Sequence, residues 1–213
     1  MTDLTYAIEE YLEQHATPMD EVLSSLYRET YLHAMNPRMA SGPVQGRFLQ
    51  LICQLMNPKR VLEIGTFTGF ATICMARGMA SDGSLITIEA NEECEGMIRR
   101  YLDKAAVADR VRLVIGDAKE VIPTLESGFD LVFIDADKIS YPVYYDLVMD
   151  KLNPGGIVLA DNVLWEGKVL NADTKERDTK AIQAFNDKVQ NDPRVENVLL
   201  PLRDGLMMVR KVR

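Results

Sequence analysis

The hydrophobic and polar positions of this chain follow two periods that alternate along most of its length. From residue 60 onward, short, mostly apolar runs alternate with longer stretches in which apolar residues recur every three or four positions. This alternation of strands and helices predicts an α/β fold with a mostly parallel sheet and helices on both faces. The expected strands begin with the run that ends at Gly65 and continue with 84–89, 111–115, 131–134, 157–160, 195–202 and 206–212.

The helical periods predict a second set of elements between these strands. A breaker, Asn153-Pro154-Gly155-Gly156, precedes the fifth strand, and Asn91 is a candidate N-cap for the helix that follows it. Asp204-Gly205 between the last two strands indicates a hairpin, so one of those strands should be antiparallel. The other expected helices are 71–79, 118–126 with an interruption at Pro123, 141–152 and 175–190.

The first 57 residues have helical periods only. We expect helices at 3–15 and 19–27, a non-helical turn at 36–43, and a helix that ends before Pro58. Because these helices precede the first strand, they should pack outside the sheet, as a cover over a substrate site or as a subunit contact. The 213 residues suit one domain, with a helical cover at 1–57 and a core at 58–213.

A glycine turn follows the first strand. Gly65 and Gly69 lie between that strand and a helix, where glycine lets the backbone approach a ligand closely. A dinucleotide-binding turn carries glycine two positions earlier, but this chain carries Glu63 there. A carboxylate would repel a phosphate and attract a cation. We therefore expect S-adenosylmethionine (SAM), which carries an ammonium and a sulfonium group, and disfavour a nucleotide-dependent dehydrogenase.

The second predicted strand ends in another acid, Glu89. In a doubly wound nucleoside site, an acid at this place binds the ribose hydroxyls. Glu89 is therefore the expected ribose anchor. The alternative is that Glu63 and Glu89 are ordinary acids at strand ends, with glycines that only form turns.

Polar residues also end the fourth and fifth predicted strands. Asp135 follows the fourth strand, and Asp161 and Asn162 follow the fifth. If these strands neighbour the first, the three side chains meet beside Gly65. Two carboxylates and an amide oxygen are hard ligands that suit Mg²⁺, Ca²⁺ or Mn²⁺. The alternative is that they only close two strands.

Two further residues near this predicted metal site have candidate roles. Lys138 lies three residues beyond Asp135 and could reach the same cavity. A nearby divalent cation would lower the pKa of its amine, as a general base requires, whereas the alternative is a surface lysine at a helix start. Trp165 could flank an aromatic substrate or serve packing alone.

Composition narrows the partners and the location. The formal net charge is −8 and there is no run of basic residues, which argues against nucleic acid. Cys53, Cys74 and Cys94 lie in helical patterns without metal-type spacing, so buried thiols in a reducing compartment are expected. The sequence has an acidic N-terminus and no apolar run of about 18 residues. We therefore expect no membrane association and a cytoplasmic location.

Three segments together resemble a known family. They are 61–70 around the glycine turn, 134–138 after the fourth strand and 159–165 after the fifth. They are similar to the cation-dependent, SAM-dependent O-methyltransferases of the caffeoyl-CoA and catechol type. The likeness extends over nearly the whole chain. It implies a Rossmann-like, seven-stranded sheet with an antiparallel last strand, usually in a homodimer.

The resemblance also implies site residues by position. Asp135, Asp161 and Asn162 match its metal ligands, and Lys138 matches its catalytic lysine. The positions that match its SAM contacts are Ser41, Glu63, Gly65, Thr66, Glu89, Ala118 and Asp135.

The chain departs from the family in two ways. Ala71 replaces a serine of the SAM site. Ala136 and Asp137 match the caffeoyl-CoA and bacterial branch and differ from the His-Trp pair of animal catechol enzymes. The basic residues before the glycine turn are few (Arg28, Arg38 and Arg47), which argues against a coenzyme A ester, because its phosphates need cationic partners.

The sequence thus predicts an O-methyltransferase for a small catechol-like or hydroxycinnamate-like aromatic substrate. A protein or nucleic-acid N-methyltransferase is disfavoured, because the chain lacks the polar-Pro-Pro-aromatic motif after the fourth strand that those enzymes share. A non-catalytic, regulatory SAM-binding protein remains the alternative, although the presence of Lys138 and all three metal-ligand positions argues against it.

Overall fold

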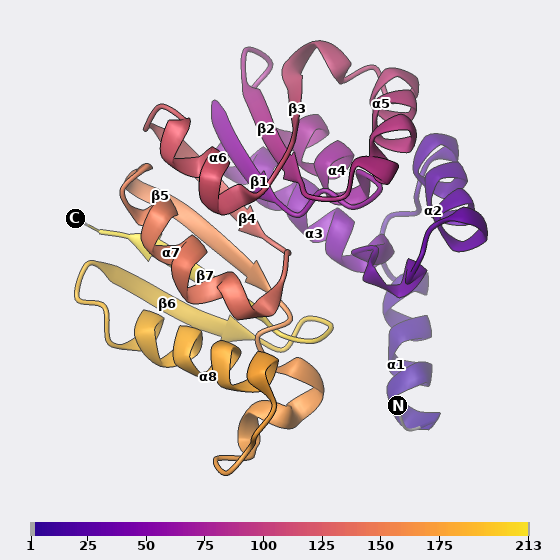
Figure 1. Ribbon diagram of the computed structural model, residues 1–213. Coiled ribbons are helices and arrows are strands. Elements are labelled where there is room, and N and C mark those ends of the chain that lie inside the picture. The colour runs from indigo at the N-terminus through magenta and orange to yellow at the C-terminus, as the bar shows by residue number, and fades with distance from the viewer. Residues whose placement is uncertain (1–2, 213) are drawn as a thin grey trace.

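A computed structural model describes residues 3–212, with side chains from residue 7 onward. Its centre is one seven-stranded sheet with the strand order β3-β2-β1-β4-β5-β7-β6 (Figure 1). The strands are β1 (Arg60–Ile64), β2 (Ser84–Glu89), β3 (Val111–Ile115), β4 (Phe129–Ile134), β5 (Leu152–Asp161), β6 (Val195–Leu200) and β7 (Leu206–Lys211). The predicted domain of residues 1–213 extends beyond the described residues at Met1, Thr2 and Arg213.

Helices flank this sheet on both faces. The α-helices are α1 (Asp3–Gln14), α2 (Glu21–His33), α3 (Gly42–Met56), α4 (Phe70–Gly78), α5 (Glu95–Lys104), α6 (Ala118–Thr124), α7 (Tyr141–Met149) and α8 (Arg177–Gln190). Short 3-10 segments are η1 (Pro37–Met39), η2 (Glu92–Cys94), η3 (Ala108–Arg110), η4 (Lys138–Ser140) and η5 (Trp165–Leu170). None of the described helices is long and apolar enough to cross a membrane.

Two apolar cores form because every central strand is buried on both faces. One core joins the sheet to α6, α7 and α8, through residues such as Tyr145 and Phe185. The other joins the opposite face to α2, α3, α4 and α5, through residues such as Leu26, Leu49 and Ile73. The predicted boundary at residue 57 therefore falls between α3 and β1, and α2 and α3 share a core with the sheet. Figure 1 shows α1 projecting away from this body.

The predicted fold class is confirmed. Strands β1 to β5 pair in parallel, whereas β7 is antiparallel to both β5 and β6. The hairpin predicted at Asp204-Gly205 joins β6 to β7, and Gly205 has a φ of 89°, which is left-handed backbone that glycine tolerates.

Several element boundaries differ from the sequence-based prediction. The expected breaker at 153–156 lies within β5, where the pairing with β4 shifts register between Phe129 and Leu131. The glycines are accommodated as an irregularity in a longer strand. The predicted non-helical turn at 36–43 contains η1 and the first turn of α3, in which proline is tolerated. Helix α2 continues to His33, and α7 ends at Met149.

The strand order places β1 between β2 and β4, with β5 next to β4. Their carboxyl ends therefore meet at one edge of the sheet, where Gly65, Glu89, Asp135 and Asp161 follow or end these strands. This edge is the place where ligands bind in open α/β sheets.

Candidate active site

The turn after β1 depends on glycine at residue 65. Its φ is 94°, and a Cβ added there would lie 2.1 Å from the backbone oxygen of Asp135. The turn is tied to its neighbours by hydrogen bonds from the Gly65 N–H to the Ile88 oxygen (2.9 Å) and from the Asp135 N–H to the Ile64 oxygen (2.8 Å). Phe67 also has positive φ (51°), which is costly for an aromatic residue and holds its N–H toward Glu89.

Glu63 lies beneath this turn, fully buried. Its Oε2 accepts hydrogen bonds from the hydroxyls of Thr72 and Thr87, the latter at 2.6 Å. Its Oε1 is buried and has no hydrogen-bond partner among the described residues. Burial, together with the charges of Asp135 and Glu89, raises the pKa of Glu63 to about 8. The Glu63 side chain therefore lies behind the glycine turn, and its unpaired oxygen suits a proton or a cationic donor.

Glu89 is held by the backbone. Its Oε2 accepts from the Phe67 N–H at 2.6 Å and its Oε1 from the Asn91 N–H at 2.9 Å. Two N–H donors fix the direction of this carboxylate, and each oxygen keeps a lone pair that could accept from the predicted ribose hydroxyls. Ala118 begins α6 beyond Gly116, whose N–H donates to the Glu89 carbonyl at 2.8 Å.

A small cavity of about 10 Å³ adjoins the turn, with Ser41, Gly65, Thr66 and Asp135 among its walls. These are four of the predicted SAM contacts. The volume accommodates about one water molecule, so this cavity alone does not hold a whole SAM molecule. Met39, also in the wall, is 55% exposed.

The predicted metal ligands meet at the ends of β4 and β5. Asp161 is 1% exposed, and its Oδ1 accepts from the N–H of Asn162 at 2.8 Å. Asn162 has left-handed backbone, with φ 59°. Burial, followed by the negative charge of Asp135, raises the pKa of Asp161 to about 6.

This donor set fits a hard divalent cation. The negative charge of Asp135 acts on the buried Asp161 carboxylate, and a cation between the two would relieve that repulsion. Asp135 and Asp161, with the Asn162 amide, offer oxygen atoms only. In the part of the chain that the structure describes, no three His, Cys, Asp or Glu side chains are grouped so that they could hold a metal ion, so the set depends on Asn162.

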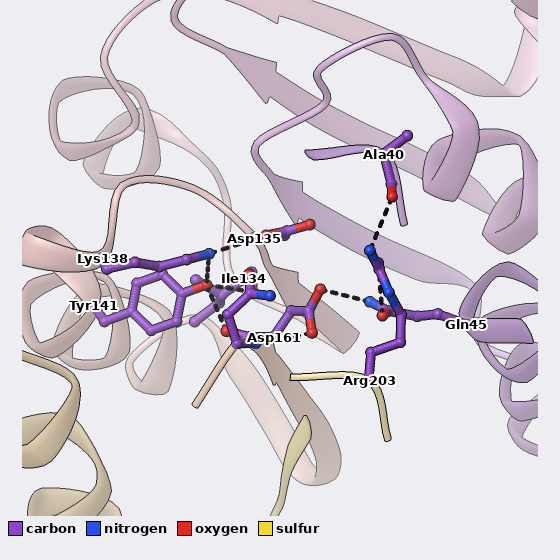
Figure 2. Close-up of polar contacts among 9 residues, drawn as sticks. Ala40, Gln45, Ile134, Asp135, Lys138, Tyr141, Asp161 and Arg203 are labelled. Carbon is purple, nitrogen blue, oxygen red and sulfur yellow. Dashed lines mark hydrogen bonds and ion pairs between the residues drawn. The ribbon is translucent and has the colours of Figure 1, made fainter. Parts of the chain in front are cut away.

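Lys138 brings its amine to the same place. Its Nζ lies 3.0 Å from Asp135 Oδ1 and donates to the Tyr141 hydroxyl at 2.8 Å (Figure 2). The Tyr141 hydroxyl donates in turn to the Asp161 carbonyl at 2.9 Å. Tyr141 is fully buried, and burial raises its pKa well above the usual value, so the phenol stays neutral. These contacts hold the lysine amine beside the two carboxylates.

A larger cavity of about 550 Å³ lies beyond Ser41, which lines both cavities. Its walls come from α1, α2, the start of α3 and the hairpin after β6, and they include Tyr27, Tyr31 and Arg203. The N-terminal helices therefore cover a space next to the predicted site. The volume is in the range of small-molecule pockets.

Three polar residues of the site were not predicted from the sequence. Gln45 donates to Asp161 Oδ2 at 2.8 Å, and Arg203 donates to Gln45 Oε1 at 3.2 Å. Tyr141 could have been found, because it follows Lys138 at helical spacing. No sequence pattern connects Gln45 or Arg203 to Asp161. The structure gives Trp165 a φ of 48° in η5, and no described contact links it to the site.

Comparisons with known proteins find similar sequences and structures over nearly the whole chain. A family model described as O-methyltransferase matches residues 13–212. A probable caffeoyl-CoA O-methyltransferase 3 of Dictyostelium discoideum is 32% identical, over 98% of this chain and 91% of that protein. A catechol O-methyltransferase of Mycobacterium tuberculosis is 41% identical over 68% of this chain and 66% of its own length. The crystal structure of an O-methyltransferase from Bacillus cereus in complex with SAH is 31% identical, with a TM-score of 0.89 over 96% of this chain and 97% of that one.

Proposed function

This chain belongs to the O-methyltransferase family and is a SAM-dependent methyltransferase, and on that premise we propose that it requires a divalent cation and methylates a small catechol-like or hydroxycinnamate-like aromatic. The observation that carries the proposal is the meeting of Asp135, Asp161 and Lys138 at the sheet edge beside Gly65. Relatives named catechol and caffeoyl-CoA O-methyltransferase support the substrate class.

In the proposed reaction, Asp135, Asp161 and Asn162 would hold a divalent cation, with Mg²⁺ expected first and Ca²⁺ or Mn²⁺ as alternatives. A cation bound there would lower the pKa of an acceptor hydroxyl that coordinates it. Lys138, in its uncharged amine form, takes the hydroxyl proton and becomes an ammonium group. The acceptor oxygen then forms a bond to the SAM methyl carbon as the carbon–sulfur bond breaks, which leaves S-adenosylhomocysteine.

The protein's contribution is mainly positional. Ser41, Gly65, Thr66, Glu89 and Ala118 would hold SAM along the carboxyl ends of β1 and β2. Because Asp135 adjoins both the cofactor turn and Lys138, the methyl donor and the acceptor oxygen would be held in line. Holding two reactants in this way removes a large part of the entropic barrier.

The cavity of about 550 Å³ is the proposed place for the body of the acceptor. Tyr27 and Tyr31 supply aromatic surface for a phenyl ring, and their hydroxyls lie 3.3 Å apart. Ser41 lies between this cavity and the one at the cofactor turn. A ring bound in the cavity would therefore lie close to the proposed methyl donor.

We also propose that nucleic acid and membranes are not partners, because the formal net charge is −8 and basic residues are dispersed. The thiols of Cys53 and Cys74 are free and buried, and burial raises the pKa of each to about 12. This thiol usage supports a reducing, cytoplasmic location.

The proposed substrate class is tested by transfer of labelled methyl from SAM to a panel of catechols, hydroxycinnamates and monophenols. Vicinal diphenols should be methylated, and monophenols should react far more slowly, because they offer a cation only one oxygen. Equal rates with both classes, or methylation of amines alone, would overturn the proposal.

A further inference from the structure

The carboxylate of Asp161 is held on both of its oxygens. Oδ1 accepts from the Asn162 N–H at 2.8 Å, and Oδ2 accepts from the Gln45 Nε2 at 2.8 Å. Asp161 is 1% exposed and Gln45 is fully buried, so water does not compete for these bonds. Each oxygen keeps a second lone pair. The two donors therefore fix the plane of the carboxylate and leave it able to bind a cation.

The Gln45 side chain can donate this hydrogen bond to Asp161 in only one orientation of its amide. Its amide has a donor end and an acceptor end of nearly the same shape, and rotation by half a turn would place an oxygen against Asp161. Arg203 selects the orientation, because a guanidinium group donates hydrogen bonds and cannot accept them. Its Nη1 donates to Gln45 Oε1 at 3.2 Å, which directs the amide nitrogen toward Asp161 (Figure 2).

Arg203 is itself fixed at a second point. Its Nη2 donates to the Ala40 carbonyl at 3.2 Å, immediately before Ser41. The backbone of Arg203 is left-handed, with φ 49°, a conformation that glycine would adopt without strain. The hairpin thus presents a long cationic side chain from a strained position. The Arg203 side chain connects the hairpin to the loop before α3. It also connects the hairpin to the end of β5, because Gln45 bonds to both Arg203 and Asp161.

We infer that Gln45 and Arg203 are positioning residues for the metal-binding carboxylate: Arg203 holds the Gln45 amide in the orientation that fixes Asp161 for the cation. The inference rests on the metal site of the proposed function. Partners of this kind typically change metal affinity by about 10–100-fold when they are removed. Neither residue touches the reacting atoms in this account.

The direction in which metal affinity changes when Arg203 is replaced separates the positioning role from a simple charge effect. Arg203 is a cation near a cation site, so by Coulomb attraction and repulsion alone its removal would tighten metal binding. Loss of positioning would weaken it. Binding of Mn²⁺ to the full chain, followed by the electron paramagnetic resonance signal of free Mn²⁺ without SAM or acceptor, measures this directly.

We expect Arg203→Gln to raise the Mn²⁺ dissociation constant about 10-fold or more. Arg203→Lys, which keeps the charge but lacks the planar fork that reaches two oxygens, should raise it by a smaller factor. Arg38→Gln is the matched control, because Arg38 lines the same cavity and no hydrogen bond to Gln45 is described for it. It should leave the constant unchanged or lower it.

Thermal unfolding in chelator should be similar for all these proteins, since Arg203 and Arg38 are both exposed. Unchanged or tighter Mn²⁺ binding by Arg203→Gln would overturn the positioning role while the metal site stood. A wild-type chain that bound no Mn²⁺ would overturn the metal site and this inference with it.

Discussion

At the scale of single residues, the proposed mechanism assigns its most specific role to Lys138, which accepts the hydroxyl proton. Its amine is 3.0 Å from Asp135 Oδ1 and bonded to Tyr141, and its side chain is only 11% exposed. Lys138→Met keeps the length of the side chain but removes the base. We expect kcat to fall by about 10²–10⁴-fold, with SAM affinity nearly unchanged because Lys138 does not line the small cavity at the glycine turn.

Steady-state kinetics with calorimetric titration of SAM separates these two quantities. Tyr141→Phe is a useful comparison, because it removes one hydrogen-bond partner of Lys138 and keeps the amine. Its loss of kcat should be smaller. Unchanged turnover in Lys138→Met would remove Lys138 from the mechanism.

The buried Glu63 predicts, also at the scale of one residue, how the free energy of unfolding depends on pH. Its folded-state pKa is about 8, above its ordinary value of 4.5. Between these values the folded protein keeps a proton that the unfolded chain has released. The contribution of Glu63 to the free energy of unfolding therefore declines as pH rises through this window, by at most about 1.4 kcal/mol per pH unit.

Glu63→Gln removes this titration and keeps the shape of the side chain. Urea unfolding without SAM at pH 5.5 and pH 7.5 should show that the variant gains stability relative to the wild type as pH rises. Asp161 titrates in both proteins, so its effect largely cancels in the difference. Parallel pH profiles would show that Glu63 does not hold a proton in the folded state.

At the scale of elements, the turn between β1 and α4 packs closely against the backbone of Asp135, which follows β4. A Cβ on residue 65 would approach the Asp135 backbone oxygen to 2.1 Å, so in Gly65→Ala the turn or the Asp135 backbone must shift. We expect at least about 1–3 kcal/mol of destabilisation and loss of SAM affinity. Gly96→Ala on α5, where an added Cβ meets nothing within 4 Å, is the control.

Chemical unfolding and SAM titration of both variants test this prediction. Full stability and SAM affinity in Gly65→Ala would mean that the turn is looser than the structure indicates. A loss in both variants would point to a general effect of the substitution instead.

Most of these elements could be predicted from the sequence, because their signals are local. Strand β2 was predicted with the observed bounds, 84–89, from its apolar run and flanking turn residues. The acids at the strand ends could be grouped because parallel strands end at one edge. Gln45 and Arg203 could not be grouped with them, since only tertiary packing brings α3 and the last hairpin to Asp161. The 153–156 segment was predicted to lie outside the strand because of its local turn residues. The structure includes it in β5 as an irregularity, because Leu152 and Ile157 on either side of it pair with β4.

At the scale of the whole molecule, the strand order brings the residues of the candidate site together. The grouping of Asp135 and Asp161 beside Gly65 required β1, β4 and β5 to be neighbours, which the sequence pattern left open and the sheet confirms. The hairpin pattern showed that one of the last two strands is antiparallel. Its identity as β7 followed from the family resemblance, because local periods contain no information on which strands pair.

The outer surface of the N-terminal helices bears on assembly. Many of the exposed large apolar side chains belong to α1–α3 and the segment before α3, and Leu51 and Leu55 of α3 are 49% and 82% exposed. A homodimer is therefore our proposal, and sedimentation should give twice the mass of the 24.0 kDa chain. Leu51→Glu with Leu55→Glu should shift the protein to monomers, because charged side chains resist burial at an interface.

Leu170→Glu is the matched control for this experiment. Leu170 is 87% exposed and belongs to η5, outside the N-terminal helices. It should sediment like the wild type. A wild-type protein that sediments as a monomer at micromolar concentration would contradict the homodimer without affecting the active site.

The central claim is that methyl transfer needs a cation held by Asp135, Asp161 and Asn162. The most direct test is transfer of labelled methyl from SAM to a catechol in the presence of Mg²⁺, after a chelator, and after Mg²⁺ is restored, with SAM binding measured in each state. The account predicts that the chelator abolishes turnover, that Mg²⁺ restores it, and that SAM still binds throughout. Turnover that survives complete chelation would contradict the metal site, even if the SAM site were correct.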